Sequence, residues 1–330
     1  MSRLFRDVDG GPRCPHGSVV CIGAFDGLHL GHQALVRQAV ERGRALGVPS
    51  VALSFEPLPR EFFAPADPPP RLQLPRAKAL GLFGLGADQV GLLRFDRALC
   101  SLEAGEFVRR VIVQRLSARE IWVGPGFRFG KARGGDLATL QEHGLRHGFS
   151  AHEIAPVQLD GERVSATRIR AALQEGAFGD AARLLGRSYA IGGHVVRGRQ
   201  LGRTLGYPTA NLRFGGKRPA LSGIYATWVH GLGQPRASVS SFGTRPTVDG
   251  IEPLLEAHLF DFDGDLYGRR IEVEFVAKLR DEVKFPDLPA LTVQMDRDAV
   301  QARALLARTA SPEPTPAPAC ADLSQETASR

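Results

Sequence analysis

The stretch Ser18–His32 reads SVVCIGAFDGLHLGH and joins two different sequence patterns. Its first part, Ser18–Phe25, is a short apolar run with β-branched residues, which is typical of a buried strand. A helix with one apolar face is predicted to follow, from Gln33 to about Leu46. A strand, a glycine-containing loop and a helix in this order predict the ligand-binding edge of a parallel sheet.

The loop between this strand and helix has the composition of a phosphate site. Backbone amides at a helix start favour anions, and Gly23, Gly27 and Gly31 let the backbone approach a phosphate. His29 and His32 are three residues apart, so they share a face if the helix has begun. Two imidazoles there could stabilise charge on a transferring phosphoryl group without an enzyme nucleophile. The alternative is two polar histidines at an ordinary helix start.

The rest of the first half keeps this alternation of apolar strands and amphipathic helices. Strands are expected at Val51–Phe55, Gln89–Arg94, Glu120–Gly124 and Ala151–Val157, and helices near 76–85, 102–116 and 136–147. Two further helices are expected at Thr167–Gln174, which Gly176 ends, and at 178–185. The alternation predicts a parallel sheet with helices on both faces.

After Gly186 the pattern changes to frequent Gly and Pro with short alternating strands. These strands are expected at 189–197, 222–230, 236–241, 253–260 and 269–277, and a helix at about 287–308 closes the segment. The pattern predicts a small antiparallel barrel. The resulting domains are 15–185 and 186–308, and the Pro-rich tail at 309–330 is predicted to be disordered.

Composition limits the classes of protein that fit. The chain has 330 residues and 43% hydrophobic composition, enough for two cores. It shows no signal-peptide or membrane-span pattern, and its four cysteines are scattered, so a cytoplasmic protein without disulfides, zinc or a membrane partner is expected. The net charge of +7 fits nucleic acid or small polyanions such as ATP. Because Lys and Arg form no long basic run, no nucleic-acid partner is predicted. We also expect a monomer or a weak homo-oligomer.

A second candidate phosphate site lies in Gly192–Asn211, GGHVVRGRQLGRTLGYPTAN. Its recurring glycines could expose backbone amides to phosphates, although such a signal is weak alone. Thr209 and Asn211 are two residues apart and point the same way on an extended strand. Their oxygens could hold Mg²⁺ against ATP phosphates, because hard cations prefer oxygen ligands. The alternative is a turn followed by a strand with outward polar residues.

Glu256 lies in a predicted strand, Leu254–Leu259, whose residues alternate between two faces. Three of its apolar residues face one way, and Glu256 and His258 face the other. A carboxylate there could take the proton from a primary hydroxyl as it attacks the γ-phosphate of ATP. His258 is expected to orient or pack rather than to catalyse. The alternative for Glu256 is a solvated strand residue.

Segments of both halves resemble one known family, the prokaryotic bifunctional FAD synthetases. In the first half, Gly23–His32 resembles the signature G-x-F-D-G-x-H-x-G-H, Ser54–Phe62 the F-x-P-x-P segment, Val123–Asp136 the V-G-x-[DN]-F-x-F-G stretch and Arg163–Arg170 the R-x-S-S-T-x-I-R motif. In the second half, Pro208–Asn211 resembles the P-T-A-N motif of riboflavin kinases, Gly243–Thr247 the G-x-R-P-T turn, Leu254–Leu259 the E-x-H strand, Asp261–Gly268 the D-F-x-x-D-L-Y-G turn and Leu279–Phe285 the L-R-x-E-x-x-F segment. The resemblance spans residues 17–308 in family order.

The resemblance implies a fold and two activities. The fold is a Rossmann-like nucleotidylyltransferase α/β domain followed by a six-stranded antiparallel β-barrel riboflavin kinase domain with a C-terminal helix. The barrel domain would phosphorylate riboflavin to FMN, and the α/β domain would adenylate FMN to FAD, both with ATP. Mg²⁺ is the implied cofactor, and riboflavin, FMN and ATP are the implied partners.

The resemblance also implies roles for individual residues. Glu256 would be the kinase base, and His29 and His32 would serve adenylyl transfer. In the α/β domain the implied ATP ligands are Gly23, Phe25, Asp26, Gly31, Arg163, Ser165, Thr167 and Arg170, and the flavin ligands are Phe55, Pro57, Phe127 and Arg128. In the barrel domain the implied ATP ligands are Gly193, Gly198, Gly202, Arg203, Gly206 and Pro208, the Mg²⁺ ligands are Thr209 and Asn211, and the flavin ligands are Arg280 and Glu282. The turn Asp261–Gly268 is interpreted as structural.

Four positions depart from the family pattern. Gly126 stands where Asp or Asn is usual, Ala166 replaces a serine, Leu58 occupies a frequent histidine position, and Ser241 replaces a frequent asparagine. The first two motivate an alternative, a riboflavin kinase whose first domain only binds nucleotide or flavin. An alternative of another class is a basic nucleic-acid-binding or flavin-sensing regulatory protein.

Overall fold

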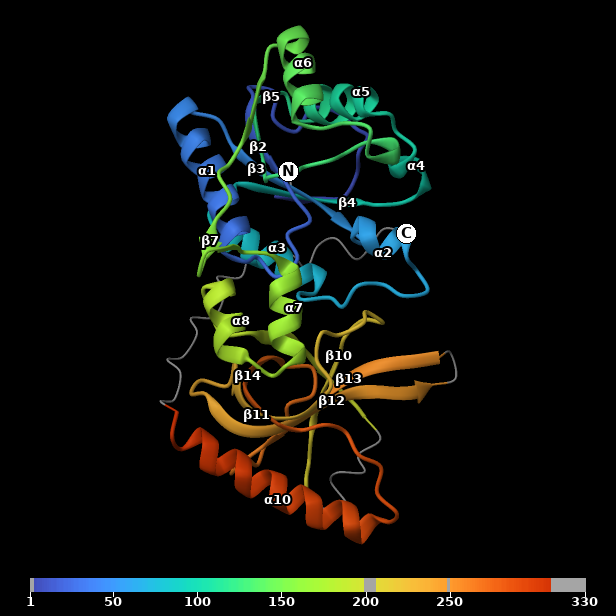
Figure 1. The fold of residues 1–330 in the computed structure, drawn as a ribbon, viewed down its shortest axis with the longest axis vertical. Coiled ribbons are helices and arrows are strands. Elements are labelled where there is room, and N and C mark those ends of the chain that lie inside the picture. Colours follow the sequence, from blue (N-terminus) through green and yellow to red (C-terminus); the bar gives the residue numbers. More distant parts are fainter. Residues whose placement is uncertain (1–2, 199–205, 248–249, 310–330) are drawn as a thin grey trace. The chain divides into compact units, whose positions relative to one another are not determined.

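The computed structural model describes residues 3–198, 206–247 and 250–309, which form two compact units (Figure 1). The first unit contains residues up to 69 together with 75–165. The second contains residues 70–74 and the chain from 166 onward. The first unit is an α/β structure, and the second is built on a closed β-barrel.

A six-stranded parallel sheet forms the centre of the first unit. Its strands are β1 (Leu4–Phe5), β2 (Ser18–Ile22), β3 (Ser50–Glu56), β4 (Gln89–Arg94), β5 (Ala118–Val123) and β6 (Ser150–Glu153). They lie in the order β1-β4-β3-β2-β5-β6, and all neighbouring pairs are parallel. The strand order reverses at β2, as in doubly wound α/β folds, so the predicted Rossmann-like domain is confirmed.

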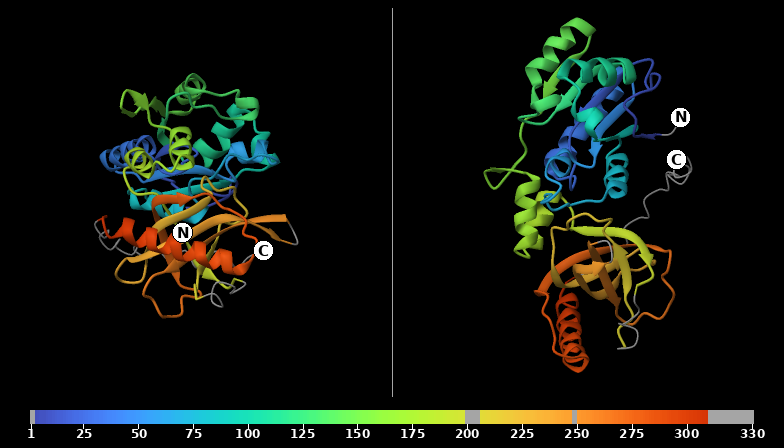
Figure 2. Two further views of the ribbon diagram at one scale, coloured as in Figure 1. Left: turned by 60° about the horizontal axis from the view of Figure 1, so that its bottom comes forward. Right: turned by 90° about the vertical axis from the view of Figure 1, so that its right-hand side faces the viewer.

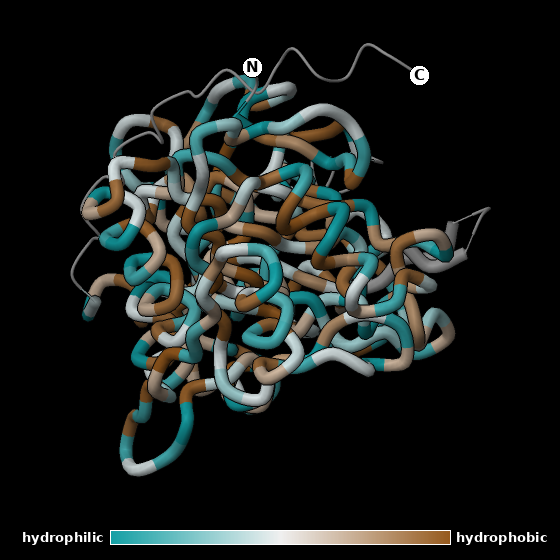
Figure 3. Tube along the Cα trace, turned by 90° about the horizontal axis from the view of Figure 1, so that it is seen from above, coloured by the Kyte–Doolittle hydropathy of each residue, from teal (hydrophilic) through white to brown (hydrophobic). Residues whose placement is uncertain are grey.

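Helices cover both faces of this sheet. They are α1 (Leu30–Leu46), α2 (Pro59–Phe63), α3 (Pro75–Gly84), α4 (Arg97–Cys100), α5 (Ala104–Phe107), the π-helix η1 (Val108–Arg115), the short 3₁₀-helix η2 (Lys131–Arg133) and α6 (Leu137–His147). Val19 and Cys21 of β2 join a core with α1 and α3, whereas Val20 and Ile22 join a second core with η1 and α6. Hydrophobic tracts lie inside the fold and hydrophilic ones follow the outer turns (Figure 3). Continuous burial along β2 therefore reflects two packed faces.

Some boundaries in the first unit differ from the prediction. β2 ends at Ile22 and not at Phe25, because Phe25 adopts a positive φ of 49° that breaks the strand. α1 begins at Leu30 and not at Gln33, because the side chain of His29 caps it. The single helix predicted over 102–116 is a short helix, α5, followed by the π-helix η1.

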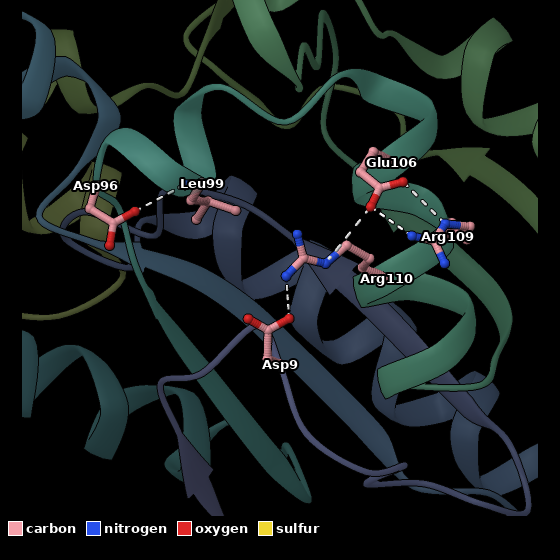
Figure 4. Close-up of polar contacts among 6 residues, drawn as sticks. All are labelled: Asp9, Asp96, Leu99, Glu106, Arg109 and Arg110. Carbon is pink, nitrogen blue, oxygen red and sulfur yellow. Dashed lines mark hydrogen bonds and ion pairs between the residues drawn. The ribbon is translucent and has the colours of Figure 1, made fainter.

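The first residues of the chain also belong to the α/β unit, although the predicted domain began at residue 15. β1 pairs with β4 at the edge of the sheet. Beyond it, Asp9 contacts the guanidinium of Arg110, whose Nε lies 3.9 Å from a carboxylate oxygen of Glu106 (Figure 4). The backbone N–H of Arg13 donates to the carbonyl of Arg115 over 2.8 Å. A two-residue strand and surface ion pairs leave no periodic signal in the sequence.

The second unit is a closed antiparallel barrel, as predicted. Its strands are β9 (Ala190–Val196), β10 (Ala210–Arg213), β11 (Gly223–His230), β12 (Arg236–Thr247), β13 (Gly250–Leu259) and β14 (Arg270–Arg280). They close in the order β10-β13-β12-β11-β14-β9. Apolar side chains fill the inside, including Leu212, Phe242 and Leu255. Buried hydroxyls also occur there, and Thr227 Oγ1 lies 2.7 Å from Ser240 Oγ.

The helix α10 (Leu288–Leu306) lies along the outside of the barrel, against β11, β12 and β14 (Figures 1 and 2). Its buried residues Ala302 and Leu306 form a core with Phe260. Arg303 makes a two-bonded ion pair with Asp261, with N–O distances of 2.7 and 2.8 Å. The predicted C-terminal helix is therefore confirmed as an integral layer of the second unit.

Two helices precede the barrel, α7 (Ala166–Gln174) and α8 (Phe178–Leu185). The sequence assigned both to the first domain, whereas their contacts group them with the barrel. Phe178 packs against Tyr225 and Phe275, with ring centroids 5.8 and 6.0 Å away. The aromatic side chains that α8 buries against the barrel account for this difference.

We predict that Phe178→Ala destabilises the barrel by about 3–5 kcal/mol, because it removes a buried ring from an aromatic cluster. The chain has two tryptophans, Trp122 and Trp228, and only the second lies in the barrel. Urea unfolding followed by Trp228 fluorescence in a Trp122→Phe background measures the effect. Val300→Ala is the control, because this side chain is 70% exposed on α10. Equal, small changes in both variants would show that α8 does not support the barrel.

Candidate active sites

The first candidate site lies where the strand order of the parallel sheet reverses. β2 pairs with β3 on one side and with β5 on the other. The loop after β2, residues 23–29, and the loop after β5, residues 124–130, therefore leave the carboxyl edge of the sheet next to each other. Ligands bind at this position in open α/β sheets. The structure thus brings the two predicted motifs to one edge.

The loop after β2 has an unusual backbone. Phe25 and Leu28 are non-glycine residues with positive φ angles of 49° and 47°, and Gly27 has a φ of 83°. Phe25 and Leu28 are nevertheless buried in the core beside α1. Strained backbone of this kind persists where the surrounding packing fixes it, and it clusters at functional sites. Asp26 is also buried, at 2% exposure.

His29 serves as the N-cap of α1. Its Nδ1 accepts a hydrogen bond from the backbone N–H of His32 over 3.3 Å. Because Nδ1 accepts, the proton of the neutral ring lies on Nε2, which makes Nε2 a donor. The cap accepts from the His32 amide alone, so the other amides of the first turn of this 17-residue helix lack intrahelical partners, the arrangement that attracts phosphates. A Cβ at Gly31 would lie 3.3 Å from the His29 ring, so this glycine leaves room for the ring.

His32 stacks on His29, with ring centroids 3.6 Å apart. Burial, and then the positive charges of His29, Lys78 and Arg163, lower the pKa of His32 well below its usual value. Its Nδ1 is buried and has no hydrogen-bond partner among the described residues. His32 is therefore neutral near pH 7, and the stacked pair carries at most one imidazolium.

Lys78 of α3 is a member of this site that the sequence did not reveal. Its side chain is fully buried, and Nζ donates to Ser54 Oγ over 3.3 Å and to the carbonyl of Phe55 over 3.2 Å. Nζ also lies 3.3 Å from a carboxylate oxygen of Glu56. Ser54 Oγ in turn donates to the carbonyl of Ala24 over 3.0 Å. Lys78 thus joins the end of β3 to the loop after β2.

The segment around residues 163–165 lies beside the start of α1. Arg163 donates to the carbonyl of Pro125 over 3.2 Å, and its charge acts on His32. The carbonyl of Val164 lies 3.9 Å from the position of a Cβ on Gly31. Thr167 and Arg170 belong to α7, in the second unit, where Arg170 donates to the carbonyl of Pro70. The motif Arg163–Arg170 therefore spans the division between the units.

The residues predicted to bind flavin in the first unit include an aromatic group. Phe55 lies edge-on to Phe95 at 5.8 Å, and Phe95 also contacts Phe62 and Phe63. Phe63 is 67% exposed, which is unusual for so large an apolar side chain. The sequence singled out Phe55 alone of these four, because the strand pattern does not show which rings meet. Pro57 follows a cis peptide bond at the start of this segment.

The loop after β5 carries the other two predicted flavin ligands. Phe127 stacks on Phe129 at 5.6 Å and packs on the core. Arg128 is half exposed and forms an ion pair with Asp136 over 3.2 Å. Gly126 has a φ of 71°, and a Cβ there would meet nothing within 4 Å. Asn and Asp tolerate this conformation better than other residues do, so the glycine and the family's usual residue suit the same backbone.

The second candidate site is a row of side chains on one outer face of the barrel. Asn211 of β10 pairs directly with Glu256 of β13, and Glu256 pairs with Ser241 of β12. Directly opposed residues in antiparallel strands project from the same face. Leu255 and Ala257 point to the interior, as predicted, while Glu256 and His258 lie on the partly exposed face.

Asn211 has the features of a cation ligand. It is buried at 5% exposure, and its Oδ1 accepts no hydrogen bond from any described residue. Its Nδ2 donates to the carbonyl of Thr209 over 3.2 Å, which directs the amide oxygen elsewhere. A Cβ at Gly198 would lie 2.8–2.9 Å from the Asn211 amide, so only a glycine leaves this space. An oxygen held in this way fits a hard cation such as Mg²⁺.

Two cavities flank the Asn211–Glu256 pair. A cavity of about 610 Å³ contains both predicted metal ligands, and its walls are Val195, Pro208–Asn211, Leu259 and Phe262–Tyr267. A cavity of about 220 Å³ contains Glu256, and its walls are Ile224, Ser241, Gly243, Leu254, Arg280, Glu282, Val283, Phe285 and Leu291. The turn Asp261–Gly268, interpreted from sequence as structural, thus also lines the larger cavity.

Arg280 and Glu282 lie in the smaller cavity, as their prediction requires. A Cβ at Gly243 would lie 2.0–2.4 Å from the Glu282 carboxylate, so the carboxylate occupies space that only glycine leaves. Arg280 makes an ion pair with Asp298 of α10 over 2.7 Å. Asp298 is buried at 4% exposure, so this ion pair is shielded from solvent.

The predicted glycine-rich loop is only partly described. Gly202 and Arg203 lie outside the described residues, and Gly206 forms a turn with a φ of 81°. Gly193 is a residue of β9 and not of a loop, and its missing side chain makes room for Leu212. The strand predicted over 189–197 already contained this position, and the role of Gly193 as an ATP ligand stays a prediction.

The residues after this loop are anchored to other parts of the unit. His258 Nδ1 donates to the carbonyl of Pro208 over 2.9 Å, which fits the predicted orienting role. Tyr207 donates to Asp296 of α10, and burial with this hydrogen bond raises the pKa of Tyr207 to about 12. Pro208 is thereby fixed at the wall of the larger cavity.

Within residues 3–198, 206–247 and 250–309, no three His, Cys, Asp or Glu side chains form a metal-binding group. Among the described helices, none has the length and apolar character needed to cross a bilayer. A third cavity of about 560 Å³ in the first unit is lined by Arg6, Arg94 and Arg110 and by Asp7, Asp9 and Asp96. Its opposite charges balance, so it shows no preference for anions.

Comparison with known proteins gives consistent matches in both halves. The family model for FAD synthetase matches residues 11–168, and the model for riboflavin kinase matches residues 185–306. A bifunctional riboflavin kinase/FMN adenylyltransferase from Pseudomonas fluorescens is 46% identical over 89% of this chain and 94% of its own length. The protein of the same name from Escherichia coli K12 is 41% identical over 91% and 97%. A crystal structure of a macrolide-efflux protein from Streptococcus pneumoniae is 30% identical, with a TM-score of 0.73 over 91% of this chain and 98% of that one.

We predict that His32 makes the α/β unit less stable in acid. Its folded pKa is lowered, so below about pH 6.5 the unfolded chain binds a proton that the folded chain does not. The free energy of unfolding should therefore fall with decreasing pH by up to about 1.4 kcal/mol per unit from this group. His32→Gln should reduce this slope, measured by urea unfolding with Trp122 fluorescence in a Trp228→Phe background.

The exposed His16 provides the control for this experiment. His16→Gln should leave the pH dependence of unfolding unchanged. An unchanged slope in His32→Gln would mean that His32 is protonated to the same extent in the folded and unfolded chain.

Proposed function

The chain belongs to the bifunctional riboflavin kinase/FMN adenylyltransferase family, and on this basis we propose which residues carry each reaction. Its riboflavin kinase domain phosphorylates riboflavin to FMN, and its FAD synthetase domain adenylates FMN to FAD and releases pyrophosphate. Both reactions use ATP, with a divalent metal ion. The observation that carries the kinase assignment is the direct pairing of Asn211 with Glu256 between two cavities.

In the kinase, ATP occupies the larger cavity and riboflavin the smaller one. A volume of about 610 Å³ is within the usual range for ligand sites, whereas about 220 Å³ holds only the part of riboflavin that reacts. The 5′-hydroxyl oxygen attacks the γ-phosphorus, the bond to the β-phosphate breaks, and ADP leaves. Glu256 takes the hydroxyl proton. It lies in the cavity proposed for riboflavin, and it pairs directly with Asn211, which lines the cavity proposed for ATP. Arg280 and Glu282 hold the flavin.

Mg²⁺ is the proposed metal of the kinase, with Asn211 and Thr209 as its protein ligands. The buried Oδ1 of Asn211 and the space that Gly198 leaves support this choice. Held by these two residues, the ion would offset the negative charge that develops on the transferring phosphate. The further proposed nucleotide ligands of this domain are Gly193, Gly198, Gly206 and Pro208, together with Gly202 and Arg203, which lie outside the described residues.

In adenylyl transfer, a phosphate oxygen of FMN attacks the α-phosphorus of ATP, and the bond to the leaving pyrophosphate breaks. His29 donates from Nε2 to the reacting phosphates, and His32 acts as a neutral partner. Uncapped amides at the start of α1 add to this stabilisation. The further ATP ligands are Gly23, Phe25, Asp26, Gly31, Arg163, Ser165, Thr167 and Arg170, and the flavin ligands are Phe55, Pro57, Phe127 and Arg128.

The remaining proposals concern the molecule as a whole. We propose a cytoplasmic enzyme that is a monomer or weak homo-oligomer and has no nucleic-acid or membrane partner. Adenylyltransferase activity resides in residues 15–185 and kinase activity in 186–308. The alternative of an inactive first domain rests on Gly126 and Ala166. The left-handed backbone at Gly126 argues against it, because the family's usual Asn fits the same conformation.

We predict that Glu256→Gln lowers FMN formation by about 10²–10⁴-fold, the usual contribution of a general base. Adenylation of supplied FMN should be unchanged, because Glu256 is not among the residues proposed for that reaction. A chromatogram that separates FMN from FAD, after incubation with ATP and Mg²⁺, measures both products. Glu272→Gln, an exposed glutamate on β14, should retain both activities. Equal loss of both activities in Glu256→Gln would contradict separate sites.

We predict that His29→Asn lowers FAD formation from FMN by about 10²–10³-fold, because the imidazole donor is lost. Asn is a good N-cap residue, so α1 should keep its start. Riboflavin phosphorylation by the same preparation is the internal control and should not change. Full FAD formation by this variant would remove His29 from the reaction, and no FAD from the unmodified enzyme would favour the kinase-only alternative.

A further inference from the structure

Arg280 is held by the buried carboxylate of Asp298 on α10, which Gln294 of the same helix also contacts. Its Nε lies 3.0 and 3.1 Å from the two carboxylate oxygens of Asp298, and Nη2 lies 2.7 Å from one of them. Gln294, one helical turn earlier, donates to Asp298 Oδ1 over 2.9 Å. Asp298 is 4% exposed, so this carboxylate is removed from solvent and committed to Arg280 and Gln294. Charge-assisted pairs with this geometry fix orientation as well as contributing energy.

The ion pair leaves part of the guanidinium available. Arg280 has five N–H groups, of which Nε and one of Nη2 donate to Asp298 and one of Nη1 donates to the carbonyl of Asp281 over 2.9 Å. The other two have no hydrogen-bond partner among the described residues. Arg280 lines the smaller cavity together with Glu256, and its guanidinium lies 5.6 Å from the ring centre of Phe285. The guanidinium therefore has a fixed orientation at the wall of this cavity.

We propose that Asp298 is a positioning residue for riboflavin: it holds Arg280 at the cavity wall so that the two uncommitted N–H groups bind oxygen atoms of the flavin. This inference rests on the proposed assignment of the cavity to riboflavin. A freely rotating arginine would lose side-chain entropy on binding, and the buried ion pair removes that cost in advance. α10, which lies outside the barrel, thereby belongs to the substrate site.

The test compares Asp298→Asn with Arg303→Gln in the full-length enzyme. The first change keeps the shape and removes the charge that orients Arg280. The second removes the other ion pair between α10 and the barrel, which is exposed and lines neither cavity. We expect Asp298→Asn to raise the KM for riboflavin about tenfold, with kcat and the KM for ATP changed less than about threefold. Arg303→Gln should leave all three unchanged, and both variants should adenylate FMN normally.

Several outcomes decide the inference. A fall in kcat or stability without a change in the KM for riboflavin would overturn it, because a merely structural residue behaves in this way. Arg280→Met tests the underlying assignment separately: if it leaves the KM for riboflavin unchanged, the proposed role of the cavity fails. If Asp298→Asn does not fold, Gln294→Leu replaces it. A rise of about two- to threefold in the KM for riboflavin then supports the inference, and no rise overturns it.

Discussion

The pairing of Asn211 with Glu256 across β10 and β13 is the constraint on which the kinase site depends. The side chains of adjacent strands share a face only in one register, and a slip of one residue would turn one of them into the barrel. The interior fixes that register, because Leu212 and Leu255 pair directly and are both buried. Burial of apolar residues inside the barrel therefore determines the geometry of polar groups outside it.

The adenylyltransferase site depends on a different kind of constraint, the packing of a strained loop. Phe25 and Leu28 adopt positive φ angles while their side chains fill the core beneath α1. The burial of these two side chains offsets the cost of their strained backbone and places His29 at the N-cap of α1. Lys78 is linked to the same loop through Ser54, which accepts a hydrogen bond from Lys78 and donates one to the carbonyl of Ala24. Apolar burial again fixes the position of the polar groups.

Local patterns in the sequence predicted most of the fold and indicated the residues at the centres of both candidate sites. The alternation of apolar and polar residues in 254–259 predicted that Glu256 points out of the barrel. The order strand, loop, helix predicted that His29 and His32 lie at the carboxyl edge of the parallel sheet. Interactions between distant segments could not be predicted in this way. In the sequence, Lys78 looks like an ordinary surface lysine of a helix. Its complete burial depends on contacts with β3, which ends 22 residues earlier in the chain. The two-residue strand β1 lies below the length at which periodicity is detectable, and the attachment of α8 to the barrel depends on rings far along the chain.

Helix α10 contacts residues beside both cavities of the second unit. Asp296 accepts a hydrogen bond from Tyr207, next to the wall of the larger cavity, and Asp298, two residues later, forms an ion pair with Arg280, which lines the smaller cavity. Residues two apart on a helix project in nearly opposite directions. The helix α10 therefore contacts residues at the two cavities through different sides of its surface. A displacement of α10 would move the walls of both cavities together. A ligand that pushed α10 away from one cavity would therefore also change the wall of the other.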